Sequence, residues 1–182
     1  MRYTVYMSFA DPQTNLDKFG VEPGMEVADL GAGPGHYALA AGRMVGNKGH
    51  VCAVEIQKEL VEKVKNEADR EGLHHVDVVW SDLEKPGGSM LDDNTVDVVI
   101  LSNILFQIQE KEILLKETKR ILRSGGRALV IDWCDSFGGL GPPKGQLVSA
   151  DSIIDTAKKN DLLISGDIPV GAHHWGIIIQ KP

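Results

Sequence analysis

The sequence contains only two cysteines among its 182 residues, Cys52 and Cys134. Their separation matches neither a zinc ligand pair nor a CxxC redox motif, so we expect no metal site. Cys52 lies inside an apolar run and Cys134 directly follows another. This placement is typical of small buried residues in a reducing compartment.

The chain also lacks an excess of positive charge and any long hydrophobic run. Its 19 Lys and Arg face 26 Asp and Glu, for a formal net charge of −7. Such a balance disfavours a surface that neutralises phosphates, so nucleic acid is not an expected partner. No apolar stretch reaches the length of a membrane span, and the first ten residues do not resemble a signal peptide. We therefore expect a cytoplasmic protein without a membrane span.

No internal repeat or low-complexity tract divides the chain. With 182 residues and 42% hydrophobic positions, it has the size of one compact domain that can bury a core. Residues 1–24 form an N-terminal segment and possible lid, 25–134 the core, 135–148 a loop rich in glycine and proline, and 149–182 a terminal helix and strands. We expect a monomer or a homodimer.

Short apolar runs alternate with stretches of helical period from residue 26 onward. The runs cover 27–30, 51–56, 76–80, 96–101 and 128–131, with helices expected at 15–19, 57–71, 111–123 and 149–159. Two further strands are expected at 162–165 and 175–180. The alternation is typical of an α/β protein whose mainly parallel sheet carries helices on both faces.

A glycine-rich turn follows the first apolar run, and it contains Gly31, Gly33 and Gly35 just after Asp29. Glycines at the start of a helix let a ligand approach the backbone N–H groups, although a tight turn also needs them for steric reasons. The dinucleotide motif GxGxxG would need a third glycine where His36 stands. A pyrophosphate-binding turn is therefore disfavoured.

Acidic residues end the next two runs. Glu55, beside Ile56, stands where a carboxylate can accept both hydroxyls of a ribose, or where it can cap the following helix. Asp82, beside Leu83, is placed to accept from an exocyclic amine, or to form a turn. Because parallel strands end at one edge of a sheet, the three sites together predict a single binding crevice.

In this order and spacing, the motifs resemble those of the Rossmann-like, class I S-adenosylmethionine-dependent methyltransferases. The resemblance runs from residue 26 to residue 133 through VADLGAGPGHYALA, VCAVEI, VVWSDL, TVDVVILSNILFQI and RILRSGGRALVIDW. It is nearest to the type 11 branch, which is related to the ubiquinone and menaquinone biosynthesis methyltransferases. The resemblance implies a three-layer sandwich with seven strands, the last of them antiparallel.

The resemblance also implies the roles of the site residues. S-adenosylmethionine would be the cofactor and S-adenosylhomocysteine the product. The residues that it assigns to the cofactor are Asp29, Gly31, Gly33 and Gly35 for the methionine part, Glu55 for the ribose, Ile56, Leu83 and Asp82 for the adenine, and Asn103 for the methionine end. As candidates for a catalytic role, Asn103, Asp132 and His174 follow from their positions near strand ends, and each also fits a purely structural role.

The acceptor is open at this stage, and a small organic molecule is the first choice. The segment 102–106 lacks the Asn/Asp-Pro-Pro-Tyr/Phe signature of enzymes that methylate amines of nucleic-acid bases, and two cysteines are few for an arsenite methyltransferase. Three rivals stay open: a protein methyltransferase, an NAD-dependent oxidoreductase, and a binding module without turnover.

Overall fold

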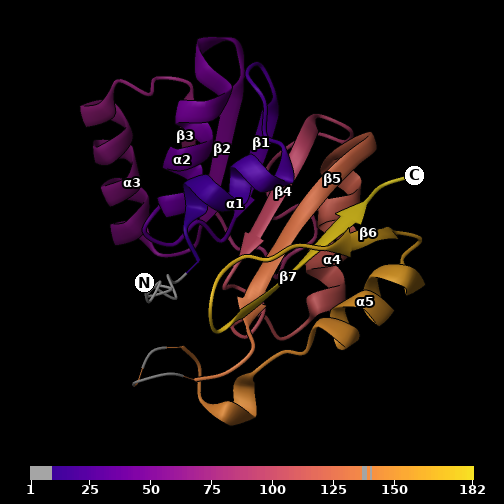
Figure 1. Cartoon of the computed structure of the whole chain (residues 1–182). Coiled ribbons are helices and arrows are strands. Elements are labelled where there is room, and N and C mark those ends of the chain that lie inside the picture. Colours follow the sequence, from indigo (N-terminus) through magenta and orange to yellow (C-terminus); the bar gives the residue numbers. More distant parts are fainter. Residues whose placement is uncertain (1–9, 137–138, 140) are drawn as a thin grey trace, which may run out of the picture.

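The computed structural model describes residues 10–136, 139 and 141–182. They form one seven-stranded sheet with helices on both faces, as Figure 1 shows. The strands are β1 Glu26–Leu30, β2 His50–Glu55, β3 Val76–Trp80, β4 Val96–Ser102, β5 Leu122–Trp133, β6 Leu163–Asp167 and β7 His174–Gln180. The helices are α1 Pro12–Phe19, α2 His36–Val45, α3 Lys58–Glu71, α4 Lys111–Ile121 and α5 Ala150–Lys159, with short 3-10 turns at Gly46–Lys48 and Lys144–Gln146.

The strand order is β3-β2-β1-β4-β5-β7-β6. Strands β1 to β5 pair in parallel, whereas β7 lies antiparallel between β5 and β6. The predicted α/β sandwich, with its antiparallel last strand, is confirmed. The order reverses between β1 and β4, and in open α/β sheets that reversal marks the crevice where ligands bind.

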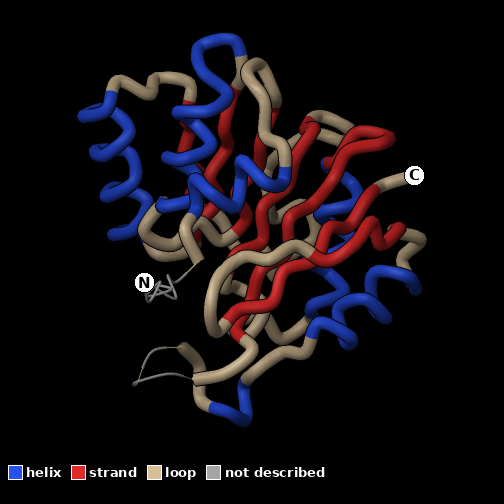
Figure 2. The backbone as a smooth tube through the Cα atoms, in the orientation of Figure 1, coloured by secondary structure: helices blue, strands red, loops and turns tan. Residues whose placement is uncertain are grey.

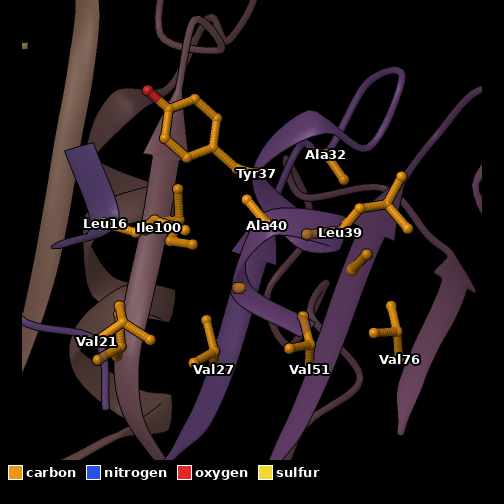
Figure 3. Close-up of a cluster of buried hydrophobic side chains, with 14 of the residues drawn as sticks. Leu16, Val21, Val27, Ala32, Tyr37, Leu39, Ala40, Val51, Val76 and Ile100 are labelled. Carbon is orange, nitrogen blue, oxygen red and sulfur yellow. The ribbon is translucent and has the colours of Figure 1, made fainter. Parts of the chain in front are cut away.

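Helices α1, α2 and α3 cover one face of the sheet, and α4 and α5 cover the other. Alternate residues of a strand point to opposite faces, so one strand contributes side chains to both apolar clusters. In β1, Val27 joins the first apolar cluster and Ala28 the second. Figure 3 shows the first cluster, where Leu39 and Ala40 of α2 lie over strand residues such as Val51. Figure 2 traces the same layers along the backbone.

Local signals explain where the helices begin and end. Helix α3 buries Val61, Val64 and Ala68 on one side and ends at Gly72, whose φ of 71° suits a helix C-terminus. Helix α1 begins at Pro12, because the Asp11 side chain accepts the backbone N–H of Thr14 at 2.7 Å. The described part of the chain contains no helix with the length and apolar character needed to cross a membrane.

Several predicted boundaries were wrong by a few residues. Helix α1 is longer than 15–19 at its start, β2 stops at Glu55 rather than 56, and β6 is shifted to Leu163–Asp167. The expected helix 111–123 ends at Ile121, because Leu122 already pairs with Val96 in the sheet. The strand expected at 128–131 is therefore much longer, since strand pairing prevails over the helical period at this point.

Candidate functional site

The glycine-rich turn joins β1 to α2, and its three glycines meet different surroundings. A Cβ on Gly31 would clash with the side chain of Ile104, and a Cβ on Gly35 would lie 2.6 Å from Val64. A Cβ on Gly33 would meet nothing within 4 Å. All three have positive φ angles, of 81°, 53° and 86° in chain order, which favours glycine at each. Only Gly33 faces open space.

Glu55 ends β2 beneath this turn. One carboxylate oxygen accepts the N–H of Gly33 at 2.8 Å, and the other accepts the N–H groups of Ile56 and Gln57 at 2.9 and 2.8 Å. The side chain is buried, with 5% of the residue exposed. Glu55 thus fixes the turn and also supports the start of α3, which fits the capping role foreseen for it.

Asp29 lies in β1, one residue before the turn begins. It is 1% exposed, and its Oδ2 has no hydrogen-bond partner in the part of the chain that the structure describes. Burial raises the pKa of this carboxyl to about 7; the N–H of Ala38 opposes the rise and the charge of Glu55 adds to it. A buried acceptor without a partner is costly, so the site favours a ligand that brings a donor.

Asn103 follows β4 and adopts a φ of 56°, in the left-handed region. Its N–H donates to the carbonyl of Ile131 at 2.9 Å, and its buried Oδ1 has no partner among the described residues. Strained residues with unmet polar atoms cluster at functional sites. Asn103 and Asp29 thus place two unpaired acceptors at the ends of neighbouring strands.

The third strand ends in an apolar and acidic rim. Leu83 is 5% exposed, whereas Ile56 is 56% exposed. The Oδ1 of Asp82 accepts the N–H of Glu84 at 3.0 Å, which makes it a turn residue that still has lone pairs to offer. The indole N–H of Trp80 donates to the carbonyl of Ile56 at 2.7 Å and so holds the chain beside this rim.

These strand ends surround one cavity of about 860 Å³, a size within the usual range for small-molecule sites. Nine residues were predicted to bind the cofactor, and eight of them lie in the wall of this cavity: Asp29, Gly31, Gly33, Glu55, Ile56, Asp82, Leu83 and Asn103. Gly35 is not among the lining residues of the described chain, because it packs on Val64 instead.

The two other catalytic candidates are absent from the cavity wall that the described residues form. Asp132 is fully buried and accepts the N–H of Leu105 at 2.9 Å. Burial raises its pKa to about 6, against the opposing N–H groups of Trp133, Leu105 and Phe106. His174 stacks on Trp133 with ring centroids 4.2 Å apart, and burial lowers its pKa.

Sequence reasoning missed part of the wall. Ala10, Asp11, Pro12 and Gln13 line the cavity, as do Ile104 and Ile108. The only sequence signals were the Asp-Pro start of α1 and the apolar spacing of four residues after β4. Neither signal shows that the two segments meet. Of the possible lids, residues 1–9 and residues 137, 138 and 140 of the 135–148 loop lie outside the described residues.

The described residues contain no group of three or more His, Cys, Asp or Glu side chains that could hold a metal ion. Cys52 is buried within the sheet as expected, whereas the expected burial of Cys134 is wrong, because this residue is exposed after the end of β5. The described cavity wall thus offers carboxylates, amides and backbone N–H groups, together with the side chains of His36, Tyr37 and Arg43.

The strand order separates this chain from dinucleotide-binding dehydrogenases, whose six strands are parallel in the order 3-2-1-4-5-6. Here β7 is antiparallel and stands between β5 and β6. Together with the Gly33 turn and the Glu55 carboxylate, this arrangement defines a Rossmann-like methyltransferase of class I.

Comparison with known proteins identifies the family. Residues 21–175 match the family described as "Methyltransferase domain", and the chain belongs to that family. A solved S-adenosylmethionine-dependent methyltransferase from Aquifex aeolicus superimposes with a TM-score of 0.86 at 29% identity, covering 96% of this chain and 91% of that one.

Two curated relatives carry more specific names. The ubiquinone/menaquinone biosynthesis C-methyltransferase UbiE of Vibrio cholerae is 30% identical over 122 residues, which are 65% of this chain and 45% of that protein. An arsenite methyltransferase of Halobacterium salinarum is 31% identical over 110 residues, or 60% of this chain and 27% of that protein. The chain thus matches less than half the length of either relative.

Proposed function

We propose that the protein transfers the methyl group of S-adenosylmethionine to a small organic acceptor. The observation that carries the proposal is the pair of buried, unpaired acceptors, Asp29 Oδ2 and Asn103 Oδ1, at the ends of β1 and β4. Family membership supports S-adenosylmethionine as the cofactor.

The donor set of the cofactor fits this wall. An ammonium group brings three N–H donors and a positive charge, which suit Asp29 and Asn103. Ribose hydroxyls suit the lone pairs of Glu55, which is already fixed by three backbone N–H groups. The open space above Gly33 leaves room for a ligand against the backbone.

The adenine would lie among Ile56, Leu83 and Asp82 at the end of β3. Ile56 is an exposed hydrophobic residue on the cavity wall, and covering it with an aromatic base removes apolar surface from water. Asp82 would accept a hydrogen bond from the exocyclic amine of the base. Gly31 would act through the shape of the turn, whereas Gly35 would serve the packing against Val64.

When bound, the cofactor supplies a methyl group already activated by its sulfonium. The residues of the chain then have to hold donor and acceptor in line, and such positioning lowers a barrier by several kcal/mol. Ala10, Asp11, Gln13 and His36 also line the cavity, and we assign this part of the wall to the acceptor.

A small acceptor is favoured because one cavity of limited volume would have to hold both the cofactor and the acceptor. The name of the UbiE relative indicates C-methylation of a small molecule, whereas arsenite chemistry is disfavoured here. Thiolates are the soft ligands such chemistry would need. Cys52 is 3% exposed inside the sheet, and neither cysteine lines the cavity that the described residues form.

The first test is titration calorimetry with S-adenosylmethionine, S-adenosylhomocysteine and NAD. We expect the first two to bind the wild type, with affinity at least about tenfold lower in Asp29→Asn and Glu55→Gln, because each variant loses a charged acceptor. Asp151→Asn is the matched control, since Asp151 is exposed on α5 and outside the cavity wall.

The rivals give other results. Binding of NAD alone would replace the proposal with an oxidoreductase. Binding of S-adenosylmethionine without methyl transfer to any small acceptor, but with transfer to protein substrates, would favour a protein methyltransferase. Binding without any transfer would favour a module that has no turnover.

A further inference from the structure

The carboxylate of Asp132 joins the end of β5 to the turn that follows β4. Its Oδ2 accepts the N–H of Leu105 at 2.9 Å, and its Oδ1 accepts the N–H of Trp133 at 2.8 Å. The residue is fully buried. A buried charge is retained at such a cost only where hydrogen bonds satisfy it, and here both oxygens receive backbone donors.

The turn that Asp132 holds needs support. Asn103 begins it with a φ of 56°, a conformation that costs about 1 kcal/mol or more for a residue with a Cβ. The carbonyl of Ile131 accepts the N–H of Asn103, and the carboxylate of Asp132 accepts the N–H of Leu105. Two consecutive residues of β5 therefore hold the turn on both sides of Ile104.

Ile104 connects this turn to the glycine-rich turn of β1. Its side chain fills the space that a Cβ on Gly31 would need, so the two turns are in contact. Ile104, Asn103 and Gly31 all line the cavity, whereas Asp132 is absent from the wall that the described residues form. A change at Asp132 can reach the ligand only through these neighbours.

We infer that Asp132 is a positioning residue, whose buried carboxylate holds Asn103 and Ile104 in the shape that receives the methionine end of the cofactor. This inference rests on the proposed function for the identity of the ligand. It replaces the expectation of Asp132 as a proton acceptor, because both of its oxygens are engaged by backbone donors inside the protein.

The test compares two buried carboxylates that differ in the loop they hold. Glu117 is 4% exposed and accepts the N–H of Ser89 at 3.0 Å. Neither Glu117 nor Ser89 lines the cavity formed by the described chain. Asp132→Asn and Glu117→Gln each replace a carboxylate oxygen by an NH2 group, which cannot accept a backbone N–H. Both variants should therefore lose thermal stability.

Only Asp132→Asn should lose affinity. We expect its dissociation constant for S-adenosylhomocysteine to rise about tenfold, as measured by calorimetry well below both melting temperatures. Glu117→Gln should stay within about twofold of the wild type, because distant sites act independently. Equal affinity in Asp132→Asn and the wild type would overturn the inference, as would an equal loss in both variants.

Amide hydrogen exchange gives a readout that needs no ligand and separates this inference from the proposed function. In the free wild type, the Leu105 amide should exchange as slowly as amides within β5, and Asp132→Asn should speed its exchange about tenfold or more. Fast exchange of Leu105 in the wild type would overturn the inference even if the variant failed to fold. A wild type that binds no S-adenosylhomocysteine but protects Leu105 would overturn the proposed function and leave the preformed turn in place.

Discussion

At the scale of single residues, Asp29 differs from the other carboxylates of the cavity. Asp82 is partly exposed and Glu55 receives three backbone N–H groups, whereas one oxygen of Asp29 has no partner. Burial raises the pKa of Asp29 to about 7, so the free protein holds a large share of this group protonated at neutral pH. A cationic ligand would favour its ionised form.

Cofactor affinity should therefore depend on pH. We expect the affinity for S-adenosylmethionine to rise about tenfold between pH 6 and pH 8, because the ammonium group binds the ionised form of Asp29. Calorimetry in buffers of different ionisation enthalpy should detect proton release on binding at pH 6. In Asp29→Asn the pH dependence should disappear; its persistence there would assign it to another group.

The glycines of the turn allow a second prediction. Gly33→Ala should cost about 1 kcal/mol of stability, for its positive φ alone, yet abolish most cofactor binding because the new methyl group enters the cavity. Gly35→Ala should cost about 2–4 kcal/mol, because its methyl group also meets Val64.

Urea unfolding and calorimetry on both glycine variants separate the two effects. The expected result is a stable Gly33→Ala protein with little affinity, beside a weakly stable Gly35→Ala protein that keeps its affinity below its melting temperature. A Gly33→Ala protein that keeps its affinity, beside a Gly35→Ala protein that loses it, would mean that the ligand approaches the turn at Gly35.

At the scale of secondary structure elements, a buried amide adds hydrogen bonds to the apolar packing of α1 on the rest of the protein. Asn15 is 1% exposed, and its Nδ2 donates to the hydroxyl of Tyr37 at 2.9 Å and to the carbonyl of Val170 at 3.1 Å. One side chain thus joins α1 to α2 and to the segment before β7. Since Ala10 to Gln13 line the cavity, this attachment places one end of the site.

Asn15→Ala should cost about 2 kcal/mol of folding stability, because it removes two buried hydrogen bonds. It should also weaken acceptor binding or raise the acceptor KM, while the affinity for S-adenosylhomocysteine changes little. Asp17→Ala is a suitable control, since Asp17 is exposed on α1 and outside the cavity wall that the described residues form. If Asn15→Ala lost as much affinity for the cofactor as for the acceptor, the cofactor rather than the acceptor would lie against α1.

At the scale of the whole molecule, the pH dependence of stability is shaped by buried carboxyl groups, some with a raised pKa and one with a lowered pKa. Asp29 and Asp132 have pKa values raised by burial to about 7 and about 6, so the stability they contribute in the protonated form is lost as pH rises from about 4 to 7. Burial alone would raise the pKa of Glu117, but hydrogen bonds from Arg120 and Ser89 lower it to about 2. Its contribution is lost as pH falls below about 4.5.

The free protein should therefore melt at its highest temperature near pH 4, and about 10 °C lower at pH 8. His174 acts in the opposite direction, because burial lowers its pKa and its contribution is lost below about pH 6.5. Scanning calorimetry from pH 4 to pH 8 measures the profile. In Asp29→Asn the decline above pH 4 should be shallower; an unchanged decline would assign it to other groups.

Local patterns were sufficient to predict the order of the elements and the strand ends that meet at the cavity. The strands alternate with amphipathic helices, and acidic residues or glycines stand at or within two residues of the ends of β1, β2 and β3. Parallel strands bring their carboxyl ends to one edge whatever the details of packing, so Asp29, Glu55 and Asp82 could be placed together from the sequence.

Other features depended on contacts between distant parts of the chain. Gly35 belongs to the packing of α2 on α3, because Val64 occupies the space beside it. Asp132 points away from the cavity and holds the neighbouring turn, a direction that strand periodicity alone did not reveal. The N-terminal Ala10 to Gln13 reach the cavity through the attachment of α1.

The sequence by itself thus determined the class of fold, the crevice and the chemical types of its residues, because these follow from periodicity and from the geometry common to parallel sheets. The tertiary structure alone decided which polar atoms are left without partners and which are engaged. That outcome depends on hydrogen bonds and packing between residues far apart in the chain, as between Asn103 and Ile131 or Asp132 and Leu105.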